Sequence, residues 1–182
     1  MAVLTIRTFP DPVLRERARE IERVTDAHRR LASDMIETMR KAPGVGLAAP
    51  QVGVVERIFV WEIGDDGGVV VNPRIATASQ EKLDEEEGCL SLPGIAYEVS
   101  RAARVRVEGL DLEGDELSLE GEGLLARVCQ HEIDHLDGIL FIDRLIPELR
   151  REALGALREQ SLHLPPLPGD APTRMLPPEE IL

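Results

Sequence analysis

Residues 131–135 have the pattern H-E-x-x-H, the spacing in this chain that is most able to carry chemistry. Residues four apart lie on the same face of an α-helix, about one turn from each other. Two imidazoles in that arrangement can bind one metal ion, and the glutamate between them, Glu132, can act on a water molecule at the metal. The pattern fixes only three positions, so two histidines on a solvated helix are the alternative.

The neighbouring residues favour a buried helix. Gly121 and Gly123 interrupt the preceding strand-like segment, and Gly138 stands where a helix commonly ends. Between them, apolar residues recur at helical spacing: Leu124, Leu125, Val128, Ile133 and Leu136. A helix that is apolar on most faces is usually buried. Buried imidazoles need partners, and a metal ion supplies one.

Two histidines do not complete a catalytic metal site, which usually takes three protein ligands. The longer metalloprotease pattern H-E-x-x-H-x-x-G-x-x-H fails here because its last position is Phe141. The third ligand must therefore come from elsewhere in the sequence. The candidates are a carboxylate or one of four residues: Cys89, Cys129, His28 and His163.

Cys89 is the strongest of these candidates. It lies between Gly88 and Gly94 in a short segment where the backbone can approach a ligand closely, and a thiolate binds zinc or ferrous iron well. Cys129 is two residues from His131, so it points to a different side of the helix and is expected to be a core cysteine. We expect His28 to be solvated in its charged segment, and His163 lies in a proline-rich tail.

Three short motifs in the sequence resemble those of one known family. Residues 44–51 (G-V-G-L-A-A-P-Q), residues 87–91 (E-G-C-L-S) and residues 130–135 (Q-H-E-I-D-H) resemble the signature motifs of peptide deformylase, in that family's order. Residues 10–15 also resemble the family's N-terminal segment, and the likeness covers about residues 3–146. The three motifs together are very specific. The resemblance implies a metal-dependent hydrolase that removes the formyl group from the N-terminal formylmethionine of new proteins.

The chemistry of formamide hydrolysis agrees with the resemblance. One ion per chain, held by Cys89, His131 and His135, would make its bound water more acidic, and Glu132 would move that water's proton to the leaving amine. The family motifs imply that the oxyanion is met by the side-chain amide of Gln51 and the backbone N–H of Leu90. They also imply Fe²⁺ as the native ion in many members, with Zn²⁺ often found after aerobic purification.

Two groups of residues are candidates for contacts with the substrate. The resemblance implies that backbone groups of Val45, Gly46 and Gly88 grip an extended peptide by strand addition, although small residues in series also simply permit close packing. Leu124 and Val128 are candidates, with Val45, to line a methionine pocket, and core packing is the alternative for both. Arg127 either borders the cleft or reaches solvent along its aliphatic stem.

Composition restricts the possible partners of the protein and its cellular compartment. The net charge of −13 and the pI of about 4.8 argue against general nucleic-acid binding. Two cysteines, one of them needed as a thiolate, fit a reducing compartment, and no segment has the pattern of a signal peptide or a membrane span. We therefore expect a cytoplasmic protein that acts on N-formylmethionyl nascent peptides. The acidic run at residues 84–87 is expected to be a solvated loop.

The pattern of elements predicts an α+β fold, with antiparallel or mixed strands packed around the central metal-binding helix and flanking N-terminal and C-terminal helices. A helix is expected from residue 25 or 26 to residue 40 and another over residues 148–159. Strands are expected over residues 57–63, 69–71, 104–108 and 116–120. Residues 1–159 form one catalytic domain, and residues 160–182 form a proline-rich tail.

The sequence leaves open the contact with the ribosome and two rival functions. In certain deformylases a basic C-terminal helix docks on the ribosome, but here Arg150, Arg151 and Arg158 are balanced by acidic neighbours, so a transient ribosome contact is in doubt. A zinc endopeptidase is one rival function, and a non-catalytic, metal-stabilised binding protein is another. Glu132 and Gln51 argue against the latter, since neither is needed merely to bind a metal.

Overall fold

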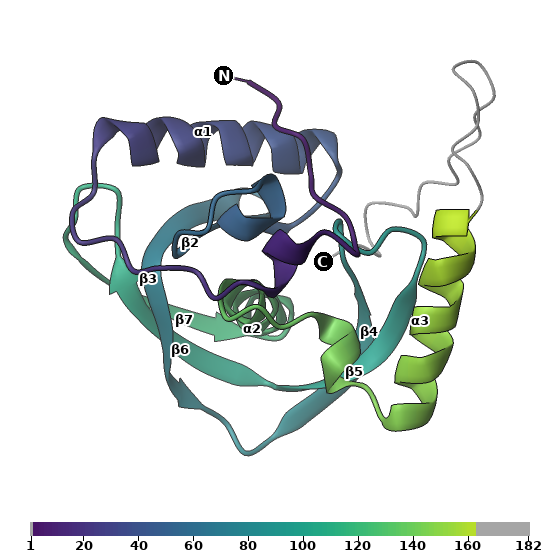
Figure 1. Cartoon of the computed structure of the whole chain (residues 1–182). Helices are drawn as coiled ribbons and strands as arrows, with labels where there is room; N and C mark the ends of the chain where they lie inside the picture. Colours follow the sequence, from purple (N-terminus) through teal and green to yellow (C-terminus); the bar gives the residue numbers. More distant parts are fainter. Residues whose placement is uncertain (1, 163–182) are drawn as a thin grey trace.

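The computed structural model describes residues 2–162 and has the α+β architecture that the sequence predicts. A five-stranded antiparallel sheet and a separate two-stranded sheet surround a central helix (Figure 1). The helices are α1 (Asp26–Lys41), α2 (Leu124–Leu136) and α3 (Pro147–Leu162). The strands are β1 (Gly46–Ala48), β2 (Ile58–Ile63), β3 (Asp66–Ala78), β4 (Lys82–Gly88), β5 (Ala96–Ala102), β6 (Arg104–Leu110) and β7 (Glu116–Glu122).

The larger sheet has the strand order β1-β2-β3-β6-β7, and every neighbouring pair is antiparallel. Its strands β2, β6 and β7 match the expected ones, but β1 was not among the predicted strands, and β3 is much longer than the predicted residues 69–71. Two irregularities in its pairing with β6 let β3 bend. The bent sheet lies around α2 in Figure 1, so the helix is enclosed rather than laid on a flat face.

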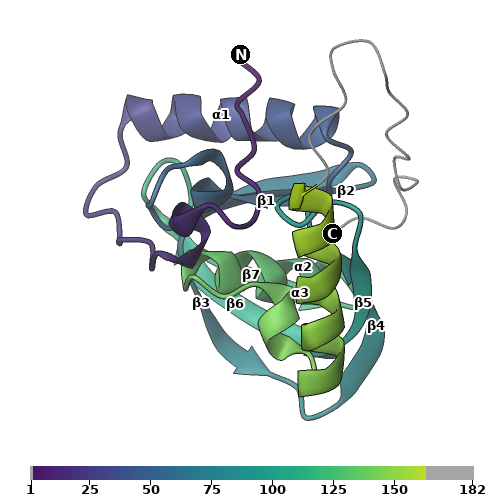
Figure 2. The same ribbon diagram turned by 45° about the vertical axis from the view of Figure 1, so that its right-hand side comes forward.

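Helix α2 is the centre of the packing, as its apolar sequence predicts. It contacts β7, β1, β2 and β5, and ten of its residues, from Ala126 to Leu136, are buried. Its apolar side chains join Phe59, Val70 and Val107 of the sheet in one core cluster. A second cluster lies between β5 and α3, and α1 covers the sheet on the side away from α2 (Figure 2). Burial on all sides fixes α2 in position, which matters for any site built on it.

The prediction that residues 84–87 form a solvated loop is wrong. These residues belong to β4, which pairs with β5 from Lys82 opposite Ala102 to Gly88 opposite Ala96. Asp84, Glu85 and Glu86 are exposed, but Glu87 is fully buried. Four consecutive acidic residues hide the alternation of polar and apolar residues that usually reveals a strand. The burial of one of them depends on partners from other elements.

The description of His28 as solvated is also wrong. Its Nδ1 accepts a hydrogen bond of 3.0 Å from the backbone N–H of Thr25, and its Nε2 lies 3.4 Å from Glu56. The side chain is largely buried at the start of α1, where it satisfies a free backbone donor. His28 is not part of the group of side chains that could hold a metal ion, which is formed by Cys89, His131 and His135.

The two flanking helices are confirmed. α1 begins at Asp26, as expected, and α3 runs to Leu162, three residues beyond the predicted end. The rest of the proline-rich tail, including His163, lies outside the described residues, so the division at residue 159 stays a prediction. Over residues 2–162, no helix is long and apolar enough to cross a membrane.

Gly138 makes a testable contribution to the position of α2. It follows the helix with φ +74°, and a Cβ there would lie 2.6 Å from the carbonyl oxygen of Arg15. Gly114 has a similar φ of +91° with nothing within 4 Å. Gly114→Ala should therefore cost ~1–2 kcal/mol of unfolding free energy through backbone strain alone. Gly138→Ala should cost about 1–3 kcal/mol more, because a backbone contact must also move.

Urea unfolding of the two variants against the wild-type protein measures this difference. Equal losses of stability in Gly138→Ala and Gly114→Ala would contradict the close approach of residue 138 to the N-terminal segment.

Candidate functional site

Cys89, His131 and His135 come together in the interior. All three side chains are buried, and one ligand atom from each lies within 4.8 Å of the other two. The Sγ of Cys89 lies 3.2 Å from the Nε2 of His135. Among the described residues, this is the group of Cys, His and carboxylate side chains arranged to hold a metal ion. Of the candidates for the third ligand, the structure thus brings Cys89 to the two histidines.

The elements that carry these residues explain the arrangement. His131 and His135 lie one turn apart on α2, and their ring centroids are 4.9 Å apart. Cys89 follows the last residue of β4 in a turn closed by a hydrogen bond from the Leu92 N–H to the Cys89 carbonyl. The backbone N–H of Ser91 also donates to the Cys89 sulfur at 3.4 Å. That contact orients the sulfur, which binds metals in its thiolate form.

Cys129 behaves as the core cysteine that the sequence predicts. It is fully buried among Val128, Ile133 and Leu136. Burial, together with the nearby charge of Glu132, raises the pKa of its thiol to about 12. It therefore stays neutral and apolar at physiological pH.

The unpaired atoms at the site fit a metal ion. The Nε2 of His131 is buried and has no hydrogen-bond partner in the described part of the chain. Its other ring nitrogen, Nδ1, lies 3.0 Å from Glu87. A neutral ring that donates its Nδ1 proton to this carboxylate has a free lone pair on Nε2, as metal-binding histidines do. A buried acceptor without a partner is costly, and a divalent ion between the thiolate and two imidazoles would remove that cost. One sulfur and two nitrogens suit zinc or ferrous iron.

Glu132 lies beside the candidate ligands and faces β1. It is almost fully buried, and its Oε2 has no hydrogen-bond partner over residues 2–162. Burial raises the pKa of Glu132 to about 7. A Cβ on Gly46 would lie 2.3 Å from the Oε1 of Glu132, so any side chain there would displace the carboxylate. This close approach gives Gly46 a packing role.

Gln51 lies at the same site, in the 3-10 helix Ala49–Val52. Its Oε1 accepts a hydrogen bond of 2.8 Å from the Ala48 N–H, which orients the amide. Its Nε2 is then directed to the Cys89 sulfur at 3.6 Å and the Ser91 hydroxyl at 3.2 Å. Leu90, the next residue after Cys89, is half-buried, and its side chain packs near Gly44.

The predicted pocket residues have different surroundings. Val128 is fully buried in the core cluster, and its Cγ1 would lie 3.0 Å from a Cβ on Gly46. Val45 is half-buried against the same cluster, and Gly88 is buried at the end of β4. Leu124 is 43% exposed at the first turn of α2, so core packing does not explain its apolar side chain.

Arg127 takes neither of the two positions expected from the sequence. It is buried, with Nη1 2.8 Å from the Oε1 of Glu87 and further bonds to the carbonyls of Leu83 and Val99. The attraction of a buried carboxylate, rather than solvent or a cleft, determines its conformation. Arg127 thus joins α2 to both strands of the small sheet.

Glu87 and Arg101 are functional residues that the sequence reasoning missed. Glu87 accepts hydrogen bonds from Arg101, Arg127 and His131. Burial alone would raise the pKa of Glu87, but the bonds from Arg101 and His131 outweigh it and hold that pKa well below its ordinary value. The sequence signals for Glu87 were its place as the first residue of the motif at residues 87–91 and its position at the end of an acidic run.

Known proteins resemble this chain in both sequence and structure. The polypeptide deformylase family matches residues 3–151. The peptide deformylase of Acidothermus cellulolyticus is 52% identical over 159 residues, which cover 87% of this chain and 88% of that protein. The chain belongs to the polypeptide deformylase family. As such it is a metal-dependent hydrolase that removes the formyl group from the N-terminal formylmethionine of newly made proteins.

Solved deformylase structures share the fold. The peptide deformylase of Thermus thermophilus is similar with a TM-score of 0.83 and 51% identity, covering 88% of this chain and 96% of that one. The deformylase of Ehrlichia chaffeensis in complex with actinonin has a TM-score of 0.84 at 40% identity, covering 88% and 98%. The α+β fold predicted from the sequence is thus the deformylase fold.

The two cysteines provide a direct test of the site. Cys89→Ala should lose bound metal, because it removes the sulfur that lies beside the two imidazoles. Cys129→Ala should keep a full complement of metal and lose only about 1–3 kcal/mol of stability from the core. Metal content per chain after gel filtration, measured on both folded variants, checks this expectation. A Cys89→Ala protein with full occupancy would exclude Cys89 as a ligand.

Proposed function

We propose that this deformylase performs its reaction at the centre formed by Cys89, His131 and His135, which hold one divalent ion per chain. The observation that supports this most directly is the buried, unpaired Nε2 of His131 beside the Cys89 thiol and the second imidazole. A bound ion would make a water molecule more acidic and polarise the formyl carbonyl.

Glu132 is the residue that moves the proton. It is next to His131 and carries an unpaired carboxylate oxygen, so it can accept the proton of the attacking water and deliver it to the departing amine. A pKa raised to about 7 by burial suits both steps near neutral pH. The Gln51 amide and the Leu90 backbone N–H stabilise the oxyanion, and the bond from Ala48 holds the Gln51 amide ready for it.

The peptide is gripped by backbone groups of Val45, Gly46 and Gly88. β1 is the last strand of its sheet and pairs with β2 on one side, which makes it an edge suited to strand addition. Because such pairing does not depend on side chains, the enzyme can accept many nascent proteins. Val45, Val128 and the exposed Leu124 line the pocket for the methionine side chain.

The setting of the enzyme is the cytoplasm, where Cys89 stays reduced and N-formylmethionyl nascent peptides are made. A transient contact with the ribosome stays a prediction. In α3 the arginines have acidic neighbours: Arg151 lies 3.9 Å from Glu148, and Arg150 donates to Asp143 at 3.1 Å. These pairs do not form the uniformly basic surface that favours RNA.

Release of formate from formyl-Met-Ala-Ser tests the function. The enzyme should release formate from this peptide without cutting internal bonds in an unformylated peptide of similar length. Replacing methionine by norleucine should change the rate little, whereas glycine should lower it, since each buried methylene is worth ~1–3 kcal/mol. Internal cleavage at a comparable rate would favour the endopeptidase reaction instead.

Glu132→Gln tests the proton transfer. The amide is nearly isosteric and should leave the metal in place, but it cannot accept a proton, so turnover should fall by at least ~10²-fold. Glu86→Gln, on the exposed side of β4, is the matched control and should retain full activity. Near-normal turnover in a folded, metal-loaded Glu132→Gln protein would exclude this role.

Ferrous iron is the ion that we propose for the active enzyme, with zinc acquired during aerobic purification. The ligand types accept either ion, so the test compares apoprotein loaded anaerobically with each. The iron form should turn over faster and lose activity on brief exposure to peroxide, whereas the zinc form should survive because zinc has no redox chemistry. A zinc form as fast as the iron form would contradict the assignment.

A further inference from the structure

We propose that Arg101 is a positioning residue of the metal centre, which sets the distance between the turn that carries Cys89 and the helix that carries both histidines. The proposal rests on the ligand set proposed above, and it assigns a function to a residue on β5 that lies outside all three sequence motifs.

Arg101 is 5% exposed and binds two carboxylates on different elements. Its Nε and Nη2 donate to the two oxygens of Glu87 at 2.7 and 2.9 Å, which is a bidentate pair with β4. Its Nη1 donates to Asp134 of α2 at 2.6 Å. One rigid, planar guanidinium therefore fixes both the distance and the angle between β4 and α2.

Both carboxylates are directly linked to the candidate ligands. Glu87 is two residues before Cys89 and also accepts the bond from the Nδ1 of His131. Asp134 immediately precedes His135 on α2. Arg101 is thus connected to His131 through Glu87, to His135 through Asp134, and to Cys89 through Glu87 and Gly88, while it binds none of the three directly.

The topology shows why such a link is needed. β4 and β5 form a sheet of their own, which shares no strand with the five-stranded sheet over residues 2–162. Backbone bonds join the two sheets at the end of β4 opposite to Cys89, where the Ala103 N–H donates to the Glu81 carbonyl and the Ser79 N–H donates to the Arg104 carbonyl. Three side chains add the connection between the small sheet and α2: Arg101, Arg127, and Gln130, whose amide bonds both backbone groups of Ala102.

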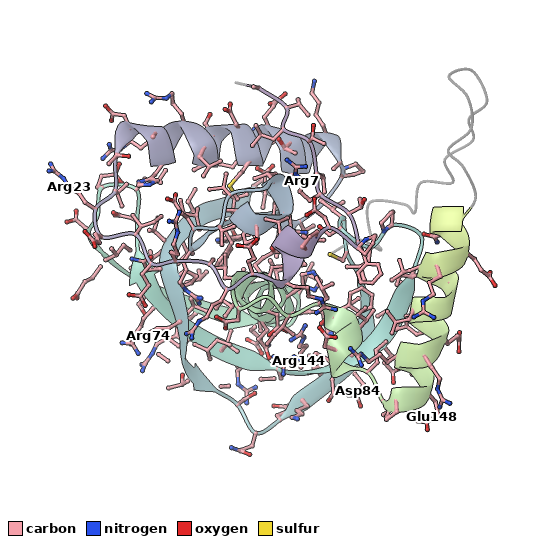
Figure 3. The ribbon with its side chains drawn as sticks, in the orientation of Figure 1. Arg7, Arg23, Arg74, Asp84, Arg144 and Glu148 are labelled. Carbon is pink, nitrogen blue, oxygen red and sulfur yellow. The ribbon has the colours of Figure 1, made fainter. Side chains whose placement is uncertain are left out.

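Two neighbouring arginines differ from Arg101 in an informative way. Arg127 binds Glu87, but its other bonds go to β4 and β5 rather than to Asp134. Arg144, labelled in Figure 3, binds Asp134 at 3.1 Å and is 46% exposed, so it lies at the solvent edge of the network. Among the described arginines, Arg101 is the one whose bonds join Glu87 to Asp134.

Cobalt(II) is a suitable probe, because its spectrum reports both the thiolate ligand and the coordination geometry. Arg101→Lys keeps the charge but cannot bind Glu87 bidentately and Asp134 at once. It should weaken cobalt binding, measured by chelator competition, by about 10–100-fold, the range for residues that orient metal ligands. It should also shift the visible absorption bands. Arg74→Lys, at an exposed arginine that pairs with Glu108 on the larger sheet, is the control and should leave affinity and spectrum nearly unchanged.

A double-mutant cycle separates positioning from general stability. If Arg101 acts through Glu87, then Arg101→Met should weaken cobalt binding much less in a Glu87→Gln background than in the wild-type protein. Additive losses would overturn the proposal. So would an Arg101→Lys protein that melts earlier as apoprotein but binds cobalt with wild-type affinity and spectrum.

The proposed set of metal ligands can be tested separately from the role of Arg101. A wild-type cobalt protein without a thiolate charge-transfer band, or a Cys89→Ala protein that keeps one, would overturn the assignment of Cys89. It would also overturn the role proposed for Arg101. A thiolate band that depends on Cys89 but is unchanged in Arg101→Lys would overturn only the role of Arg101.

Discussion

The geometry of the site depends on one buried carboxylate, that of Glu87. An ionised carboxylate in the interior is tolerated only when it is paired and hydrogen-bonded. Glu87 meets that condition with Arg101, Arg127 and His131. Leaving one partner of a buried pair alone typically costs ~3–5 kcal/mol. That is a large part of the ~5–15 kcal/mol by which a typical domain is stable, so β4, β5 and α2 are held in one arrangement.

The same carboxylate links the fold to the chemistry. Because Glu87 accepts the Nδ1 proton of His131, the ring is held in the tautomer whose Nε2 can bind a metal. The bonds from Arg101 and His131 hold the pKa of Glu87 low, so it stays ionised and accepts the Nδ1 bond without carrying a proton itself. A network that looks purely structural thus determines which ring atom faces the Cys89 thiol.

Tight packing around α2 contributes a second constraint. Gly46 passes so close to Glu132 that a side chain there would displace the carboxylate, and Gly138 lets the N-terminal segment lie against the end of the helix. These glycines are required by contacts between distant segments rather than by local turns alone. The result is a helix buried on most faces, whose buried polar residues are confined to the site and to the Glu87 network.

The sequence by itself determined the local chemistry of this protein. The H-E-x-x-H spacing placed two imidazoles on one face of a helix, and the apolar residues around it predicted the burial of α2. The three motifs indicated the deformylase family, and alternating residues predicted β6 and β7. Each of these inferences depends on residues close together in the chain, where backbone periodicity alone decides which side chains are neighbours.

Only the tertiary structure decided which distant side chains meet. It brought Cys89 to the histidines, directed the Gln51 amide to the Cys89 sulfur, and turned Glu87 inward while Asp84, Glu85 and Glu86 stayed in solvent. It also buried Arg127, which the sequence had suggested for the border of the cleft or for solvent. It buried Arg101 as well, which the sequence had not singled out. The reason is that burial of a charged residue is decided by partners from other elements, and the pairing of β4 with β5 and their packing on α2 supply those partners.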